Sequence, residues 1–146
     1  MSTPSTDPRR LADLFGDPIC SYTRAQALSD GTLVALPADL TAEAGFAWPV
    51  LVTASVHANV VRWGPREESE SPGTCQDQTG RTWDVLWMTR CATVSHGQAA
   101  PGQRVPVPLY RVPVTGGTEA ELVTLEVVLA VEDDQPALVL MFPHED

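Results

Sequence analysis

Two apolar runs near the end of the chain, separated by a short acidic turn, constrain the fold more than any other feature. Residues Glu121–Val131 and Ala137–Phe142 are rich in β-branched residues and flank the turn sequence EDDQP, a combination that predicts a β-hairpin. Because both strands are largely apolar, we expect helices to cover at least one face of their sheet. The sequence therefore predicts an α+β fold. We expect an antiparallel sheet of about four or five strands, with this C-terminal hairpin central and helices packed on one face.

Capping and turn residues predict the elements that precede the hairpin. Thr23 is placed to cap a helix that ends at Gly31, since Thr and Gly are typical of these two positions. Thr32–Leu36 then suits a short strand. Pro49–Arg62 carries valines at helical spacing, although its valine content also suits a strand. Val105–Val112 contains two prolines, which predicts an edge strand or an irregular one.

The middle of the chain holds an acidic segment followed by an aromatic one. Arg66–Gly73 is predicted to be an exposed loop, and Asp77–Gly80 to be a tight turn. The sequence TWDVLWMTRCATV follows. There we expect a strand at Arg81–Trp83 and a helix after it, because the later apolar residues recur at helical spacing.

Length and composition suit one folded unit with a core of its own. The chain has 146 residues, of which 43% are hydrophobic, enough to fold without a disulfide or a metal. We expect a mobile N-terminal arm over residues 1–18, with a short helix at Leu11–Phe15. A single α+β domain is expected over residues 19–143, and an acidic tail over residues 144–146.

Charge and hydropathy narrow the range of partners and locations. The net charge of −10 disfavours direct nucleic-acid binding, which depends on basic side chains. The apolar runs are too short for a membrane span, and the N-terminus has no secretory core. We therefore expect a cytoplasmic protein with no membrane or nucleic-acid partner.

The residue types present also exclude several kinds of chemistry. All nine cationic side chains are Arg, so a Schiff-base Lys and a phosphate-loop Lys are excluded. The absence of Lys also suggests a GC-rich genome. The cysteines form no CxxC pair, and the histidines have no zinc-ligand spacing, so we expect no metal and no cofactor. These residues are Cys20, Cys75, Cys91, His57, His96 and His144.

The densest unusual group is Arg81, Trp83, Asp84 and Trp87. In one interpretation, two indoles and an Arg–Asp pair frame a pocket for a planar or cationic ligand. In the other, which Trp at helical spacing favours, the tryptophans anchor the core and Asp84 caps a helix.

A second candidate lies where the first predicted helix begins. Tyr22 and Arg24 stand at its start, where free backbone N–H groups could bind an anion. Capping by Thr23 explains the same residues without a ligand.

Catalysis has weaker candidates. Cys91 could act as a nucleophile with His57 or His96 as its base, but it lies on an apolar face, where a buried structural thiol is expected. Cys75 lies beside a polar turn and is the more accessible thiol. The acidic clusters fall in predicted loops or tails, where solvated charge is the ordinary interpretation and imitation of a phosphate row is the alternative. An enzyme is therefore disfavoured.

Three sequence blocks carry a resemblance. SYTRAQALSDG (Ser21–Gly31), GRTWDVLWM (Gly80–Met88) and LYRVPVTG (Leu109–Gly116) resemble a bacterial domain-of-unknown-function family common in GC-rich genomes, plasmids and phages. The resemblance extends from about Ile19 to Phe142. It implies a shared α+β fold and an origin in a mobile element, and it brings no catalytic residue.

Two functions follow as hypotheses. The first is a non-enzymatic binding or adaptor protein, an accessory or counter-defence factor of a mobile element, whose partner is another protein or a second copy. The second is a small-molecule-binding protein or minor enzyme with a pocket near Trp83, Asp84, Trp87 and Arg24. An exposed apolar patch favours the first, and a deep cavity with a shifted carboxylate favours the second.

Overall fold

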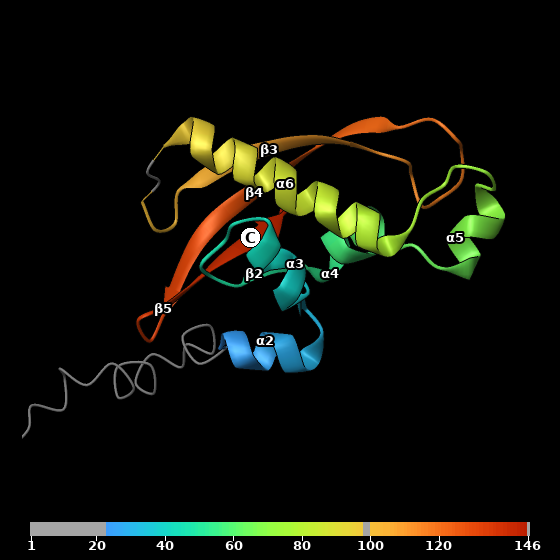
Figure 1. Ribbon diagram of the computed structural model, residues 1–146. Coiled ribbons are helices and arrows are strands. Elements are labelled where there is room, and N and C mark those ends of the chain that lie inside the picture. Colours follow the sequence, from blue (N-terminus) through green and yellow to red (C-terminus); the bar gives the residue numbers. More distant parts are fainter. Residues whose placement is uncertain (1–22, 98–99, 146) are drawn as a thin grey trace, which may run out of the picture.

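The computed structural model describes residues 23–97 and 100–145. The predicted arm, its short helix, Cys20 and Tyr22 lie outside these residues. Within them, five strands form one sheet in the order β1-β2-β5-β4-β3 (Figure 1). The neighbours β2 and β5 are parallel and all other neighbours are antiparallel, so the predicted α+β class is confirmed and the sheet is mixed. The strands are β1 (Leu33–Ala35), β2 (Val50–Thr53), β3 (Arg104–Arg111), β4 (Glu121–Glu132) and β5 (Gln135–Met141).

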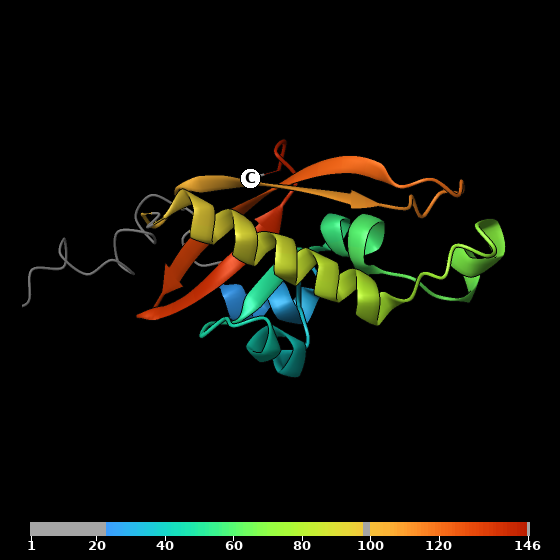
Figure 2. The same ribbon diagram turned by 45° about the horizontal axis from the view of Figure 1, so that its top comes forward.

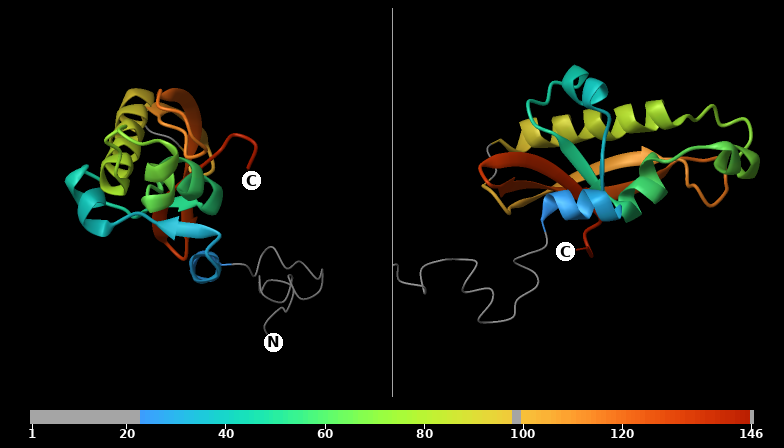
Figure 3. Two further views of the ribbon diagram at one scale, coloured as in Figure 1. Left: turned by 90° about the vertical axis from the view of Figure 1, so that its right-hand side faces the viewer. Right: turned by 90° about the horizontal axis from the view of Figure 1, so that it is seen from below.

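The helices lie mainly on one side of this sheet. The longest, α6, crosses the sheet over β3 and β4 (Figures 1 and 2). By contrast, α2 lies beside β1 and away from α6 (Figure 3). The helices are α2 (Arg24–Asp30), α3 (Ala38–Glu43), α4 (Ala54–Val56), the π-helical turn η3 (His57–Val61), α5 (Pro65–Glu70) and α6 (Gln78–His96).

The C-terminal hairpin is confirmed, and it is central in the sheet. Glu132 pairs with Gln135, which leaves a two-residue turn. Asp133 and Asp134 have φ angles of 52° and 60°, as a type I′ turn requires at both positions. Strand β4 also pairs with β3 and β5 pairs with β2, so the hairpin joins the two halves of the sheet.

Alternating side chains of the strands build two apolar clusters. The main cluster lies between the sheet and α6, α4 and η3, and includes Val56, Val85, Leu86, Val107, Leu125 and Leu140. A smaller one on the opposite face contains Leu51, Ala137, Val139 and Met141. Both clusters draw on β5, because successive strand residues point to opposite faces.

The expected strand at Arg81–Trp83 is wrong, because α6 already runs through these residues. Asp77 is its N-cap, and the Asp77 side chain accepts a hydrogen bond from the Gly80 backbone N–H. The buried hydroxyls of Thr82 and Thr89 donate to backbone carbonyls one turn earlier. A strong cap and one buried face therefore outweigh the β propensity of Thr, Val and Trp. The tight turn expected at 77–80 is the start of this helix.

The predicted loop at Arg66–Gly73 is wrong in its first half, where α5 forms. Pro65 occupies the first helical position, where its missing N–H costs nothing. The Glu67 carboxylate accepts a hydrogen bond from the Gly64 N–H at 2.7 Å.

The segment Pro49–Arg62, for which both a helix and a strand were considered, forms a strand followed by helical turns. Its first part is the buried strand β2, and Thr53 then caps α4 by accepting from the Val56 N–H. Strand β3 lies at the edge of the sheet, as its prolines predict. The α2 caps are also confirmed, with Thr23 at the start and Gly31 at φ 81°.

The packing of α6 can be tested at Leu86, which is fully buried. Leu86→Ala should lower the free energy of unfolding by about 2–5 kcal/mol, because it leaves a cavity between α6 and the sheet. Val94→Ala, at an exposed position of the same helix, should change it by less than about 0.5 kcal/mol. Urea denaturation followed by circular dichroism measures both. Similar losses for the two variants would contradict this packing.

Candidate functional site

Four of the six predicted site residues lie on α6, and the structure separates them by role. Trp83 is partly buried and packs against the main core. Asp84 and Trp87 lie at the border between α6 and the edge strand β3. Asp84 does not cap the helix, since α6 begins six residues earlier at Gln78. Arg81 is buried on the sheet side of the helix.

The border between α6 and β3 contains a hollow of about 400 Å³, here called the aromatic hollow. Its lining comes from three elements that the fold holds together. The lining residues are Asp84, Trp87, Met88, Pro108, Leu109, Tyr110 and Leu122.

Large apolar side chains are exposed around the aromatic hollow. Trp87 is 46% exposed, Tyr110 67% and Leu122 58%. Tyr110 and Leu122 are paired across β3 and β4. The Trp87 ring stacks on Trp83, with centroids 6.1 Å apart and an interplanar angle of 16°. Since Trp83 is anchored in the core, this stacking fixes the inner wall of the hollow.

A smaller cavity of about 70 Å³ shares Asp84, Leu109 and Tyr110 with the aromatic hollow. It is here called the arginine cavity, because Arg81 and Arg111 both line it. Its lining also includes Gln76, Val60, Val112 and Ala120.

Arg81 is only 4% exposed, and its hydrogen-bond acceptors are neutral. Its guanidinium donates to Gln76 Oε1 at 3.0 Å, to the Val112 carbonyl at 2.9 Å and to the Asn59 carbonyl at 3.5 Å. The guanidinium carbon also lies 4.9 Å from the centre of the Trp63 ring, which is a cation–π distance. The Nε of Arg81 is buried and has no hydrogen-bond partner among the described residues.

Arg111 is the second cation of the cavity. Its side chain is 19% exposed, and it lies 3.7 Å from the exposed carboxylate of Glu121. Its Nε and Nη1 are buried without a hydrogen-bond partner in the described part of the chain. Few buried polar groups in folded proteins lack a hydrogen-bond partner.

The surroundings shift the pKa of two groups here. Burial, together with the neighbouring charge of Arg111, lowers the pKa of Arg81 to about 10, so Arg81 remains a cation at neutral pH. Burial raises the pKa of the Asp84 carboxyl, and the charge of Arg81 opposes this effect. Desolvation therefore dominates at both residues.

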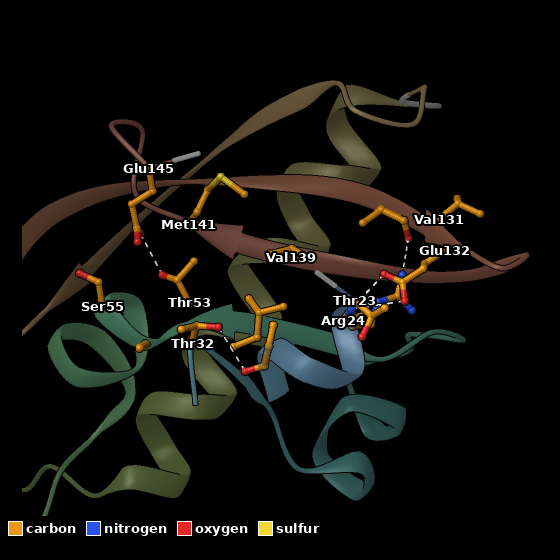
Figure 4. A pocket seen from close by; sticks show the side chains of 14 residues that line it. Thr23, Arg24, Thr32, Thr53, Ser55, Val131, Glu132, Val139, Met141 and Glu145 are labelled. Atoms are coloured by element: carbon orange, nitrogen blue, oxygen red, sulfur yellow. Dashed lines mark hydrogen bonds between the residues drawn. The ribbon is translucent and has the colours of Figure 1, made fainter. Parts of the chain in front are cut away.

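Arg24 does not join this site. At the start of its helix, where an external anion was one of two alternatives, the structure places a carboxylate of the protein itself. Both carboxylate oxygens of Glu132 accept from the Arg24 backbone N–H, at 2.9 and 3.2 Å (Figure 4). The Arg24 side chain donates to the carbonyls of Ala130 and Gln135. These contacts hold α2 on the β4–β5 hairpin.

An open groove of about 670 Å³ lies beside this contact, on the sheet face opposite α6. Val139 and Met141 form its floor, and Thr53 and Glu145 stand at one end (Figure 4). The Glu145 carboxylate accepts from the Thr53 hydroxyl and from the Phe142 N–H. The charged side chains of this groove thus form hydrogen bonds within the protein, unlike Arg111 of the arginine cavity.

The two described cysteines are both exposed. The expectation that Cys91 is buried is therefore wrong, because that side of α6 turns away from the core. Cys75 is exposed as expected. In the described ranges, no cluster of three or more His, Cys, Asp or Glu side chains is arranged to hold a metal. No described helix combines the length and apolarity needed to cross a membrane.

The comparisons with known protein families, curated proteins and solved structures find no significant match.

Arg111, Tyr110 and Leu122 were not among the candidate site residues predicted from the sequence. Tyr110 alternates with buried residues on β3, whereas Leu122 lies between exposed Glu121 and half-buried Val123 on β4. Such a pattern indicates a solvent-facing position only. Their proximity to Trp87 follows from the β3–β4 register and the position of α6, and neither is readable from local spacing.

The contact between Glu132 and α2 is testable by substitution. Glu132→Ala should lower the free energy of unfolding by about 1–3 kcal/mol, because it removes a charged acceptor from the helix start. Glu119→Ala, an exposed change of the same charge, should have little effect. Urea denaturation measures both, and equal effects would show that the contact does not stabilise α2.

The raised pKa of Asp84 predicts that the free energy of unfolding depends on pH. The native state holds the Asp84 proton to a higher pH than the unfolded chain, so stability is lost as pH rises from the unfolded pKa through the folded pKa. Asp84→Asn should therefore increase stability at pH 7 and change it little at acidic pH, where both states are protonated. Urea denaturation at both pH values tests the sign, and NMR titration of the carboxyl carbon tests the pKa. A native pKa below that of the unfolded chain would contradict this interpretation.

Proposed function

We propose that this chain is a non-catalytic binding protein, and that the aromatic hollow receives a small molecule with an apolar, planar body. The observation that carries the proposal is the exposure of Trp87, Tyr110 and Leu122 around one hollow. Soluble proteins rarely expose contiguous apolar patches, and where they do, the patch often marks a binding site.

The volume and lining of the hollow support a small-molecule ligand. About 400 Å³ lies within the range of ordinary ligand pockets, which are mostly apolar with a few polar groups. Asp84 and Tyr110 supply such groups here, and each can form a hydrogen bond with a ligand. The two tryptophans stack in an offset pair whose outer ring can accept a further planar group.

The placement of the lining also supports binding. Trp87 is held by α6, and Tyr110 and Leu122 are held by paired strands. Side chains on regular elements form more rigid sites than side chains on loops. A ligand would therefore meet a largely preformed surface.

The second candidate function is that of a protein-binding adaptor, the function that the sequence favours. The same exposed side chains support it, because aromatic residues are enriched at the centres of protein interfaces. Under this candidate function the bound protein could also be a second copy of the same chain. The cytoplasmic location, the role in a mobile element and the resemblance to a domain-of-unknown-function family stay predictions of the sequence.

Binding of phenylnaphthylamine, an uncharged fluorescent probe, tests the aromatic hollow. The wild-type chain should bind it saturably with one site. Trp87→Ala should weaken binding about fivefold to tenfold, the amount expected for losing one aromatic contact. Trp48→Ala is the matched control, because Trp48 is also exposed and lines a different groove.

Val131→Ser completes this test, since Val131 lines the groove on the opposite face. If Trp48→Ala or Val131→Ser weakens binding more than Trp87→Ala, the probe binds elsewhere and the proposal fails. A native mass spectrum of protein isolated gently from its host separates the two candidate functions. An added mass of a few hundred daltons favours the first, and a stoichiometric protein partner favours the second.

A further inference from the structure

We infer that the arginine cavity binds the anionic group of a ligand whose apolar body occupies the aromatic hollow. The group would be a compact oxyanion, such as a carboxylate, sulfonate or phosphate, held by Arg111 and Arg81. This inference rests on the proposed function, because it assigns the chemical class of ligand to the same site.

The first support is the free donor capacity of Arg111. A guanidinium has five N–H groups, and within the described residues the only charged contact of Arg111 is the 3.7 Å approach of Glu121. That distance is too long for a hydrogen bond. The side chain is nevertheless four-fifths buried, so most of it has lost water without gaining a partner.

Arg81 provides the second support. It is nine-tenths buried and lies in the same cavity as Arg111, yet its acceptors carry no formal charge. Two cations that share a cavity repel each other, and an anion between them would relieve that repulsion. The planar forks of two guanidinium groups also suit the geometry of an oxyanion.

The size of the cavity sets the size of the anionic group. A cavity of about 70 Å³ has room for about two water molecules, each of which takes about 30 Å³ in the liquid. That is enough for a carboxylate or a similar group and too small for a whole organic ligand. The shared lining residues Asp84, Leu109 and Tyr110 place the rest of the molecule in the aromatic hollow.

Asp84 carries a negative charge beside the two arginines. Its carboxylate borders both the cavity and the hollow, so it should repel an anion there. Removing the charge at Asp84 and removing the charge at Arg111 should therefore change anion binding in opposite directions. Removing the charge at Arg111 should leave the binding of an uncharged molecule of the same shape unchanged.

Two fluorescent probes test this inference. Anilinonaphthalene sulfonate carries an anionic group, and phenylnaphthylamine is its uncharged counterpart. Arg111→Gln should weaken binding of the sulfonate about tenfold, as expected for losing a charged hydrogen-bond donor. Asp84→Asn should strengthen it, while binding of phenylnaphthylamine should change less than about twofold in Arg111→Gln, because Arg111 does not line the aromatic hollow.

Arg66→Gln serves as the matched control, because it removes the same charge from an exposed position on α5. The Arg111 side chain donates no hydrogen bond to the described residues, so Arg111→Gln should fold, and a thermal melt checks this. If both probes bind the wild type equally and Arg111→Gln leaves the sulfonate unaffected, the anion site is refuted and the aromatic hollow stands. If neither probe binds, or if Trp87→Ala affects neither, the proposed function itself fails.

Discussion

The burial of one face of α6 against the sheet determines where every candidate site residue lies. Val85, Leu86 and Thr89 are fully buried on this face, and residues three or four positions apart share a side of a helix. Asp84 and Trp87 therefore fall at the border of the buried face. Because β3 is the last strand of the sheet, no further strand covers that border. The aromatic hollow is the space that remains where a long helix lies over an edge strand with two prolines, whose missing N–H groups also disfavour pairing with another strand.

The arginine cavity has an unusual electrostatic position in a chain of net charge −10. Repulsion between the acidic surface and an anion is largely screened beyond about 8 Å at physiological ionic strength. At short range the buried guanidinium groups of Arg81 and Arg111 dominate, because burial strengthens the interaction of a charge with its neighbours. A desolvated cation is costly unless it is paired. The carbonyls around Arg81 reduce that cost, and the donors of Arg111 leave part of it uncompensated.

The sequence predicted the elements whose signals are local. The C-terminal hairpin, the caps of α2 at Thr23 and Gly31, and the edge strand β3 were all predictable, because turn residues, capping residues and prolines act over a few positions. The start of α6 was misplaced because Trp83 and Val85 suit a strand, whereas the cap at Asp77 and the buried face favour a helix. Of the residues in the predicted cluster on α6, Trp87 and Asp84 line one hollow, and Trp83 supports it from the core. Arg111, Tyr110 and Leu122 could not be predicted, because strand register brings them to α6 from positions more than 20 residues away.

A comparison of the two grooves shows that volume is a weaker guide to function than whether the polar groups of a groove already form hydrogen bonds within the protein. The opposite groove is larger, but Arg24, Glu132 and Glu145 form hydrogen bonds within the protein there, and a ligand would have to compete with those contacts. At the border of α6 and β3, folding removes most of Arg111 from water and leaves three large apolar side chains exposed, and both features reduce the stability of the unliganded protein. A ligand that forms an ion pair with the Arg111 guanidinium and covers the aromatic rings would gain free energy from both contacts. It would not have to break a hydrogen bond within the protein. The smaller site is therefore the one at which we propose that a ligand binds.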